Sequence, residues 1–257
     1  MFPLGDDNSD RRSTPLVTWA LIAANVLVFV LLQGLGTNSD FTYAFSTVPA
    51  EIVTGKDVVT DDQVAEDPVS GQRFQVPGLR PTPGSVYLTL LTSMFMHGGI
   101  MHLLGNMLFL WIFGDNVEDR LGKGRFLVFY LVCGLLASLA HVATTVFLGE
   151  DAGIPSLGAS GAISGVLAGY LVLFPHRRVR VLLTLGFFAR LTEVPALFAI
   201  GLWFVFQLIS GIGMLGAGSQ QGGVAYAAHI GGFAAGWLLV RLFDRGGARP
   251  AYREAAV

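Results

Sequence analysis

The chain has little charge and almost no cysteine. Asp, Glu, Lys and Arg make up 13% of its 257 residues, and the formal net charge is −2. No basic stretch lies outside the short connections between apolar segments, so the sequence predicts no nucleic-acid partner. The single cysteine, Cys133, lies within an apolar run and excludes both an intramolecular disulfide framework and a cysteine-based metal site.

Apolar residues are in excess. They make up 53% of the chain, and the mean hydropathy is +0.60, whereas soluble domains are about 45–50% apolar and about 25% charged. The composition therefore predicts a multi-pass membrane protein. A helix needs about 20 apolar residues to cross the hydrocarbon layer. We expect an all-α bundle of six transmembrane helices within residues 15–243, at about 15–35, 102–117, 126–148, 159–174, 194–215 and 225–243.

Positive charge alternates between the two sides of these spans. Bases precede the first span, follow the second, fourth and sixth, and are scarce in the other connections; they are Arg11, Arg12, Arg120, Lys123, Arg125, the stretch "HRRVR", Arg190, Arg241, Arg245, Arg249 and Arg253. Cytoplasmic loops retain positive charge. We therefore expect cytoplasmic tails at 1–14 and 244–257 and a long acidic extracytoplasmic loop at 36–96. The N-terminus lacks the character of a mitochondrial transit peptide, which favours a bacterial plasma membrane.

Four polar residues from three spans share one depth near the outer surface. Ser160 begins the fourth span, His229 lies about one turn into the sixth, and His102 and Asn106 lie near the start of the second. Isolated polar residues are costly in hydrocarbon and normally face a cavity or a partner. His102 and Asn106 are four residues apart, so they project from one helix face.

Small residues provide a means of bringing two of these spans together. Glycine or alanine recurs every fourth residue on the fourth and sixth spans, at Gly161, Gly165, Gly169, Ala228, Gly232 and Gly236. Such faces let helix backbones approach closely. If the two faces pack, Ser160 and His229 come within hydrogen-bond reach.

A serine hydroxyl becomes a nucleophile when a base such as an imidazole removes its proton. The resulting oxyanion needs donors, and His102, the Asn106 amide and backbone N–H groups at the start of the fourth span are available. The set of residues predicts acyl transfer, most simply hydrolysis of a peptide bond.

Four motifs carry a resemblance to the rhomboid intramembrane serine proteases. They are "HGGIMHLLGN", "GDNVEDRLG", "GASG" and "AHIGGFAAG", and they lie in family order between residues 97 and 236. The resemblance implies that Ser160 is the nucleophile and His229 its general base, with His102 and Asn106 stabilising the oxyanion. His97, Gly158, Gly161, Gly232 and Gly236 would be structural residues near the site.

The resemblance also implies partners and chemistry. Single-span membrane proteins would be the substrates, cut in or near the lipid bilayer without a metal or cofactor, and the helix at 194–215 would form a lateral wall for their entry. Ser164 departs from the family pattern, which commonly has tyrosine there against the catalytic imidazole. Two alternatives stay open: a non-catalytic rhomboid-like protein that binds membrane proteins, and a transporter.

Overall fold

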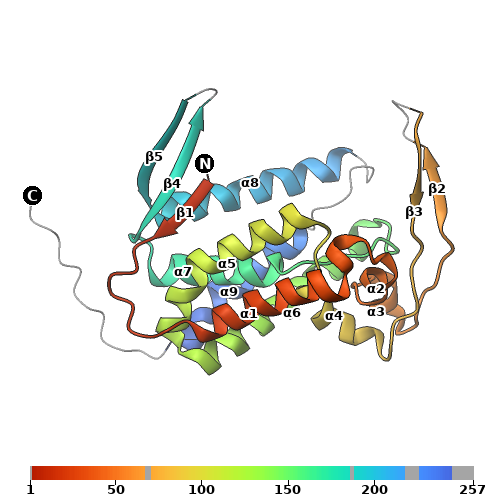
Figure 1. Ribbon diagram of the computed structural model, residues 1–257, viewed down its shortest axis with the longest axis horizontal. Coiled ribbons are helices and arrows are strands. Elements are labelled where there is room, and N and C mark those ends of the chain that lie inside the picture. Colours follow the sequence, from red (N-terminus) through yellow and green to blue (C-terminus); the bar gives the residue numbers. More distant parts are fainter. Residues whose placement is uncertain (1, 67–70, 186–187, 218–225, 245–257) are drawn as a thin grey trace, which may run out of the picture.

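A computed structural model describes residues 2–66, 71–185, 188–217 and 226–244. Most of the chain forms a helical bundle (Figure 1). Each of the six predicted segments is helical: α1 (Leu16–Leu27) continued by the π-helical turn η1 (Val28–Leu32), α5 (Ile100–Leu121), α6 (Lys123–Leu148), α7 (Ser160–Leu173), α8 (Ala196–Ala217) and α9 (Tyr226–Phe243). Figure 1 shows α8 above the other helices, on the side away from α1.

Among the described residues, α5, α6 and α9 have the length and apolar composition to cross a membrane. The apolar helical stretches of α1 with η1, of α7 and of the described part of α8 are shorter, at 10–17 residues. That six helices cross the membrane therefore stays a prediction. The predicted tail at 244–257, with Arg245, Arg249 and Arg253, lies outside the described residues except for its first residue, and so does the whole connection between α8 and α9, residues 218–225.

The expectation of an all-α chain is wrong outside the bundle. Three antiparallel strands form a sheet in the order β1 (Phe2–Asp6), β4 (Arg178–Leu185), β5 (Phe188–Pro195). The bases around position 178 predict a cytoplasmic connection between two spans. In the same stretch, however, charged residues alternate with β-branched residues, as they do in a β-strand. Val179 and Val181 are fully buried in β4. The N-terminal strand β1 therefore pairs with a strand near residue 180.

The described residues of segment 36–96 include several short helices and a hairpin. They contain α2 (Ser39–Ala44), α3 (Pro49–Thr54), the hairpin of β2 (Gln63–Glu66) and β3 (Arg73–Val76), η3 (Val86–Leu88), α4 (Thr89–Thr92) and η4 (Ser93–Phe95), after the turn η2 (Gly34–Gly36). Backbone bonds of 2.9 and 2.8 Å join Thr47 to Ser156. Because Ser156 is four residues before Ser160, this segment also braces the start of α7.

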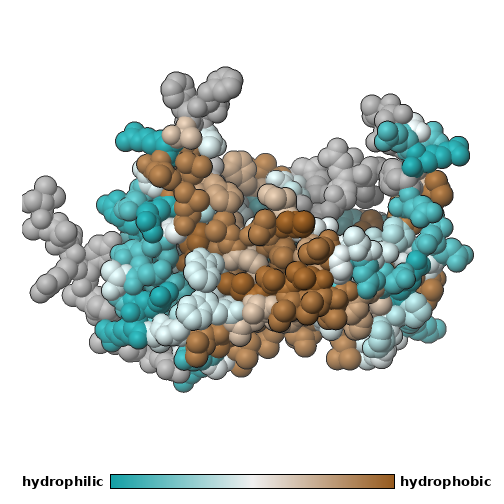
Figure 2. All heavy atoms as spheres, viewed as in Figure 1, coloured by the Kyte–Doolittle hydropathy of each residue, from teal (hydrophilic) through white to brown (hydrophobic). Residues whose placement is uncertain are grey.

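The surface of the bundle separates into an apolar middle and two polar ends. On the face that Figure 2 shows, brown apolar atoms fill the centre and teal atoms gather toward the sheet at one end and the β2–β3 hairpin at the other. Large apolar side chains that are exposed on the bundle helices include Trp19, Leu27, Leu104 and Trp111. Such a large exposed apolar surface indicates contact with a non-aqueous environment.

Glu118, near the C-terminal end of α5, binds the start of α1. Its carboxylate accepts the backbone N–H groups of Val17 and Thr18, at 3.0 and 2.7 Å, and the Thr18 hydroxyl at 2.8 Å. The residue before α1 is Pro15, whose side chain caps nothing. Glu118 therefore satisfies N–H groups that a helix start leaves without partners. The neighbouring Arg120 forms an ion pair with Asp244, just beyond α9.

Asp6, the last residue of β1, is a buried carboxyl group at the sheet end of the bundle. It is 7% exposed and accepts the Tyr170 hydroxyl at 2.6 Å and the Asn116 amide at 2.8 Å. Burial raises the pKa of Asp6 to about 7, and the hydrogen bond from Tyr170 opposes this only in part. The folded state therefore binds the Asp6 proton more tightly than the unfolded state does.

We expect Asp6→Asn to gain stability over the wild type as the pH rises. Wild-type Asp6 weakens the fold progressively between about pH 4 and pH 7, by up to about 4 kcal/mol, whereas asparagine does not ionise. Thermal unfolding of both proteins in detergent between pH 5 and pH 8 measures the difference. The difference in unfolding temperature between Asp7→Asn and the wild type should stay constant over this pH range. The pKa of Asp7 is lowered from its ordinary value, so its carboxyl group does not titrate there. A constant difference for Asp6→Asn would contradict the expectation.

Candidate active site

Helices α7 and α9 pack with their backbones almost in contact. A Cβ atom added to Gly232 would lie 2.0 Å from the carbonyl oxygen of Gly161, and one added to Gly236 would lie 2.1 Å from that of Gly165. Real Cβ atoms do not approach so closely, so only glycine fits these two places on α9. The structure thus brings together the two small-residue faces that the sequence places on these helices.

This close packing brings Ser160 and His229 together. Ser160 is the first residue of α7 and His229 the fourth of α9. The Oγ atom of Ser160 lies 2.7 Å from Nε2 of His229. The two side chains, 69 positions apart in the sequence, form a hydrogen bond in which an imidazole can take the proton of a hydroxyl.

His102 lies close to Gly158, which is two residues before α7. Its Nδ1 accepts the backbone N–H of Gly98 at 3.3 Å, so the proton of the neutral ring is on Nε2. A Cβ atom added to Gly158 would lie 3.0 Å from this Nε2 and 3.6 Å from Oγ of Ser160. Gly158 also has a φ of +130°, which favours glycine. The absent side chain leaves a place for one atom between a donor and the serine oxygen.

Asn106 and His97 form a buried pair beside His102. The Asn106 amide nitrogen lies 3.0 Å from Nε2 of His97, and the rings of His97 and His102 meet edge to face with centroids 5.1 Å apart. Gln33 holds the backbone of His97: its oxygen accepts the N–H at 2.9 Å, and its amide donates to the carbonyl at 3.0 Å. His97 is thus fixed by both its backbone and its ring.

Gln207 of α8 contacts the histidine from the side opposite Ser160. Its Oε1 lies 2.7 Å from Nδ1 of His229. The rings of Trp203 and Tyr226 have centroids 6.1 and 6.3 Å from that of His229. Ser164 takes no part, because its hydroxyl donates back to the carbonyl of Ser160 at 2.7 Å. Sequence reasoning missed Gln207, although an amide within the apolar run "LWFVFQLI" is a signal of this kind.

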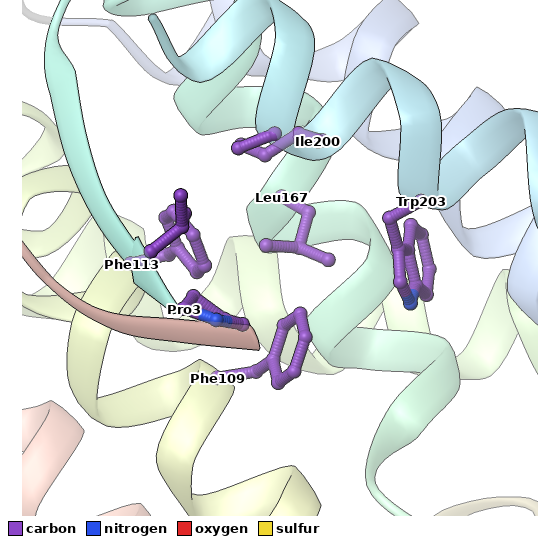
Figure 3. A pocket seen from close by; sticks show the side chains of 8 residues that line it. Pro3, Phe109, Phe113, Leu167, Ile200 and Trp203 are labelled. Carbon is purple, nitrogen blue, oxygen red and sulfur yellow. The ribbon is translucent and has the colours of Figure 1, made fainter. Parts of the chain in front are cut away.

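A small apolar cavity separates α5 from α8 next to this site. It has a volume of about 40 Å³. Figure 3 shows Phe109 and Phe113 from α5, Leu167 from α7, and Ile200 and Trp203 from α8 around it, with Pro3 of β1 at its edge. The contact between α5 and α8 is therefore looser than the contact between α7 and α9. Within the described part of the chain, no three His, Cys, Asp or Glu side chains gather to hold a metal ion.

An apolar helical bundle with polar ends defines the class as a polytopic helical membrane protein. Comparison with protein families identifies the family within this class: the Rhomboid domain matches residues 84–245, more than half of the chain. The chain therefore belongs to the rhomboid family of membrane proteins. The matched region contains all of the helices α5 to α9, and with them Ser160, His229, His102 and Asn106.

Several curated relatives carry rhomboid names. The chain is 31% identical over 224 residues to Rhomboid protease GluP of Bacillus subtilis, covering 86% of this chain and 36% of the relative. It is 33% identical over 156 residues to Rhomboid protein 1, mitochondrial, of Saccharomyces cerevisiae (59% and 40%). It is 33% identical over 113 residues to the human Presenilin-associated rhomboid-like protein, mitochondrial (43% and 29%). The chain thus spans well under half the length of these relatives.

Proposed function

We propose that this chain is an intramembrane serine endopeptidase that hydrolyses peptide bonds in or near the transmembrane segments of single-span membrane proteins. The observation that carries the proposal is the 2.7 Å hydrogen bond between Ser160 and His229, held by glycine contacts between two helices of an apolar bundle. Membership of the rhomboid family and similarity to a named rhomboid protease support it.

The proposed reaction uses a dyad. Nε2 of His229 takes the hydroxyl proton of Ser160 while Oγ bonds to the carbonyl carbon of the scissile peptide. The imidazolium then gives this proton to the leaving amine as the C–N bond breaks, which leaves an acyl-enzyme on Ser160. A water molecule, deprotonated by His229, then bonds to the acyl carbon; as the bond to Oγ breaks, the acyl group leaves as a carboxylic acid and His229 returns the proton to Oγ of Ser160. Every step uses protein groups and water, with no metal or cofactor.

The oxyanion would occupy the space beside Gly158. A Cβ atom built on Gly158 in that space would lie 3.0 Å from Nε2 of His102 and 3.6 Å from Oγ of Ser160. Donors about 3 Å from the developing negative charge stabilise the transition state most effectively. Asn106 would act on the same oxyanion through its second amide N–H, with His97 holding the amide in place.

We further propose an orientation in the membrane. The sheet end of the bundle contains Arg11, Arg12, Lys123 and Arg177, whereas segment 36–96 at the opposite end is acidic. The positive end is assigned to the cytoplasm. The site, which lies where α5, α7 and α9 begin, would then open to the outer side of the membrane, which we assign to a bacterial plasma membrane. Substrates would enter past α8.

A cleavage assay tests the proposed function. Wild-type protein reconstituted in lipid vesicles should cut a single-span reporter substrate in or beside its transmembrane segment, and chelators should leave the rate unchanged. The products are identified by mass spectrometry. Binding of the reporter by the folded wild-type protein without any cleavage would contradict the proposal and favour a non-catalytic binding protein.

A further inference from the structure

Gln207 makes a contact that the dyad alone does not require. We propose that Gln207 is a positioning residue that holds His229 in the orientation and tautomer that the reaction needs, so that helix α8 contributes to catalysis. The inference rests on the proposed protease function and adds a third residue to its site. Ser164, one helical turn after Ser160, gives the ring no support, because its hydroxyl donates to the carbonyl of Ser160.

The geometry of the contact fixes the tautomer. Oε1 of Gln207 lies 2.7 Å from Nδ1 of His229, and an amide oxygen only accepts hydrogen bonds. Nδ1 therefore carries the ring proton, and Nε2 presents its lone pair to the hydroxyl of Ser160. This is the tautomer that can act as a general base toward serine. An asparagine plays the corresponding part in papain-like proteases.

The face of α8 that carries Gln207 is turned toward the site. Trp203, one helical turn earlier, packs near the ring of His229 and lines the cavity between α5 and α8. Residues three and four apart share a helix face. The other side of α8 exposes Val205 and Ile209, which are themselves four residues apart. Gln207 is thus an amide on the site-facing side of an otherwise apolar stretch, where a polar group is costly unless it is paired.

The surroundings of His229 leave this role to Gln207. Among the described residues, the hydrogen bonds of its ring go to Ser160 on α7 and Gln207 on α8. The other titratable groups that face it are His102 on α5 and Tyr226 on α9. A neutral amide orients the ring but does not neutralise the imidazolium as a carboxylate would. A displacement of α8 from α9 would therefore release the ring of His229.

Gln207→Leu and Gln207→Glu test the inference in the full chain, with the single-span reporter. We expect Gln207→Leu to lower kcat on the order of 10²-fold with little change in KM. This is less than the ~10⁴-fold loss that follows removal of the triad aspartate's charge, because an amide supplies no charge. Gln207→Glu keeps an acceptor and should restore most of kcat. Its carboxylate favours the protonated ring, so the acid limb of the pH–rate profile should move to higher pH by about one unit.

Val128→Ala on α6 is the control for an exposed apolar side chain outside the proposed path of substrate entry, because Val128 is 50% exposed; its kinetics and pH profile should equal those of the wild type. An active wild type with unchanged kcat in Gln207→Leu would overturn the inference alone. So would a change confined to KM, which would give Gln207 a part in substrate entry only, or an unmoved acid limb in Gln207→Glu. A folded wild type without cleavage would instead fail the protease proposal itself.

Discussion

Replacement of Ser160 by alanine is expected to lower the rate of substrate cleavage by at least about 10⁴-fold, because it removes the hydroxyl that contacts the proposed general base His229. Losing the serine of a serine protease costs roughly 10⁶-fold in kcat. The hydroxyl lies 2.7 Å from Nε2 of His229, and the substitution removes it without adding an atom. Cleavage of the single-span reporter in vesicles, with thermal unfolding as a check of the fold, measures the effect.

Ser164→Ala is the matched control for Ser160→Ala. Ser164 lies one turn further along α7, and its hydroxyl donates only to the backbone carbonyl of Ser160. Such a bond within a helix adds little stability, so this variant should cleave within a few-fold of the wild-type rate. Cleavage that persists in Ser160→Ala would show that another group is the nucleophile.

Gly232→Ala is expected to have the second large effect. The added methyl group would meet the carbonyl oxygen of Gly161 at 2.0 Å, and a backbone oxygen cannot rotate away as a side chain can. Helices α7 and α9 must therefore move apart. Overpacking of this kind costs about 1–3 kcal/mol or more, and a displacement of about 1 Å in an active site costs about 10²-fold in rate.

The measurement for Gly232→Ala is the cleavage rate per folded molecule, together with the temperature of unfolding. Gly105→Ala, on α5, is the control, because a Cβ atom added there has no atom within 4 Å. The control should keep both the wild-type rate and the wild-type stability. A fully active Gly232→Ala protein of unchanged stability would show that the glycine contact does not set the distance between Ser160 and His229.

The bundle was predictable because apolar runs and small-residue spacing are local signals. The predicted segments 159–174 and 225–243 differ from α7 and α9 by one residue at each end or less. The Gly232 and Gly236 contacts follow the every-fourth-residue pattern of the sequence. The same pattern, together with the positions of polar residues in the spans, predicts that Ser160 and His229 lie at one depth and within reach of each other.

The sheet was not predictable, because its pairing joins distant parts of the chain. The alternation in β4 is a strand signal, but its charges also served as a topology signal, and nothing in Phe2–Asp6 by itself identifies a partner near residue 180. The role of Gln207 was missed for a related reason. Its partner His229 lies on another helix, and only the crossing of α8 and α9 brings the two together. A lone amide in an apolar span indicates a buried contact, but not with which residue.

Labelling with a fluorophosphonate probe tests the central claim most directly, because the probe reacts much faster with a serine that a base activates than with an ordinary hydroxyl group. Folded wild-type protein should carry one adduct, located on Ser160 by mass spectrometry, and His229→Ala should carry none at matched protein and probe concentrations. An adduct on a different residue, an adduct that forms equally in His229→Ala, or no adduct on the folded wild-type protein would contradict the claim that Ser160 and His229 form a catalytic pair.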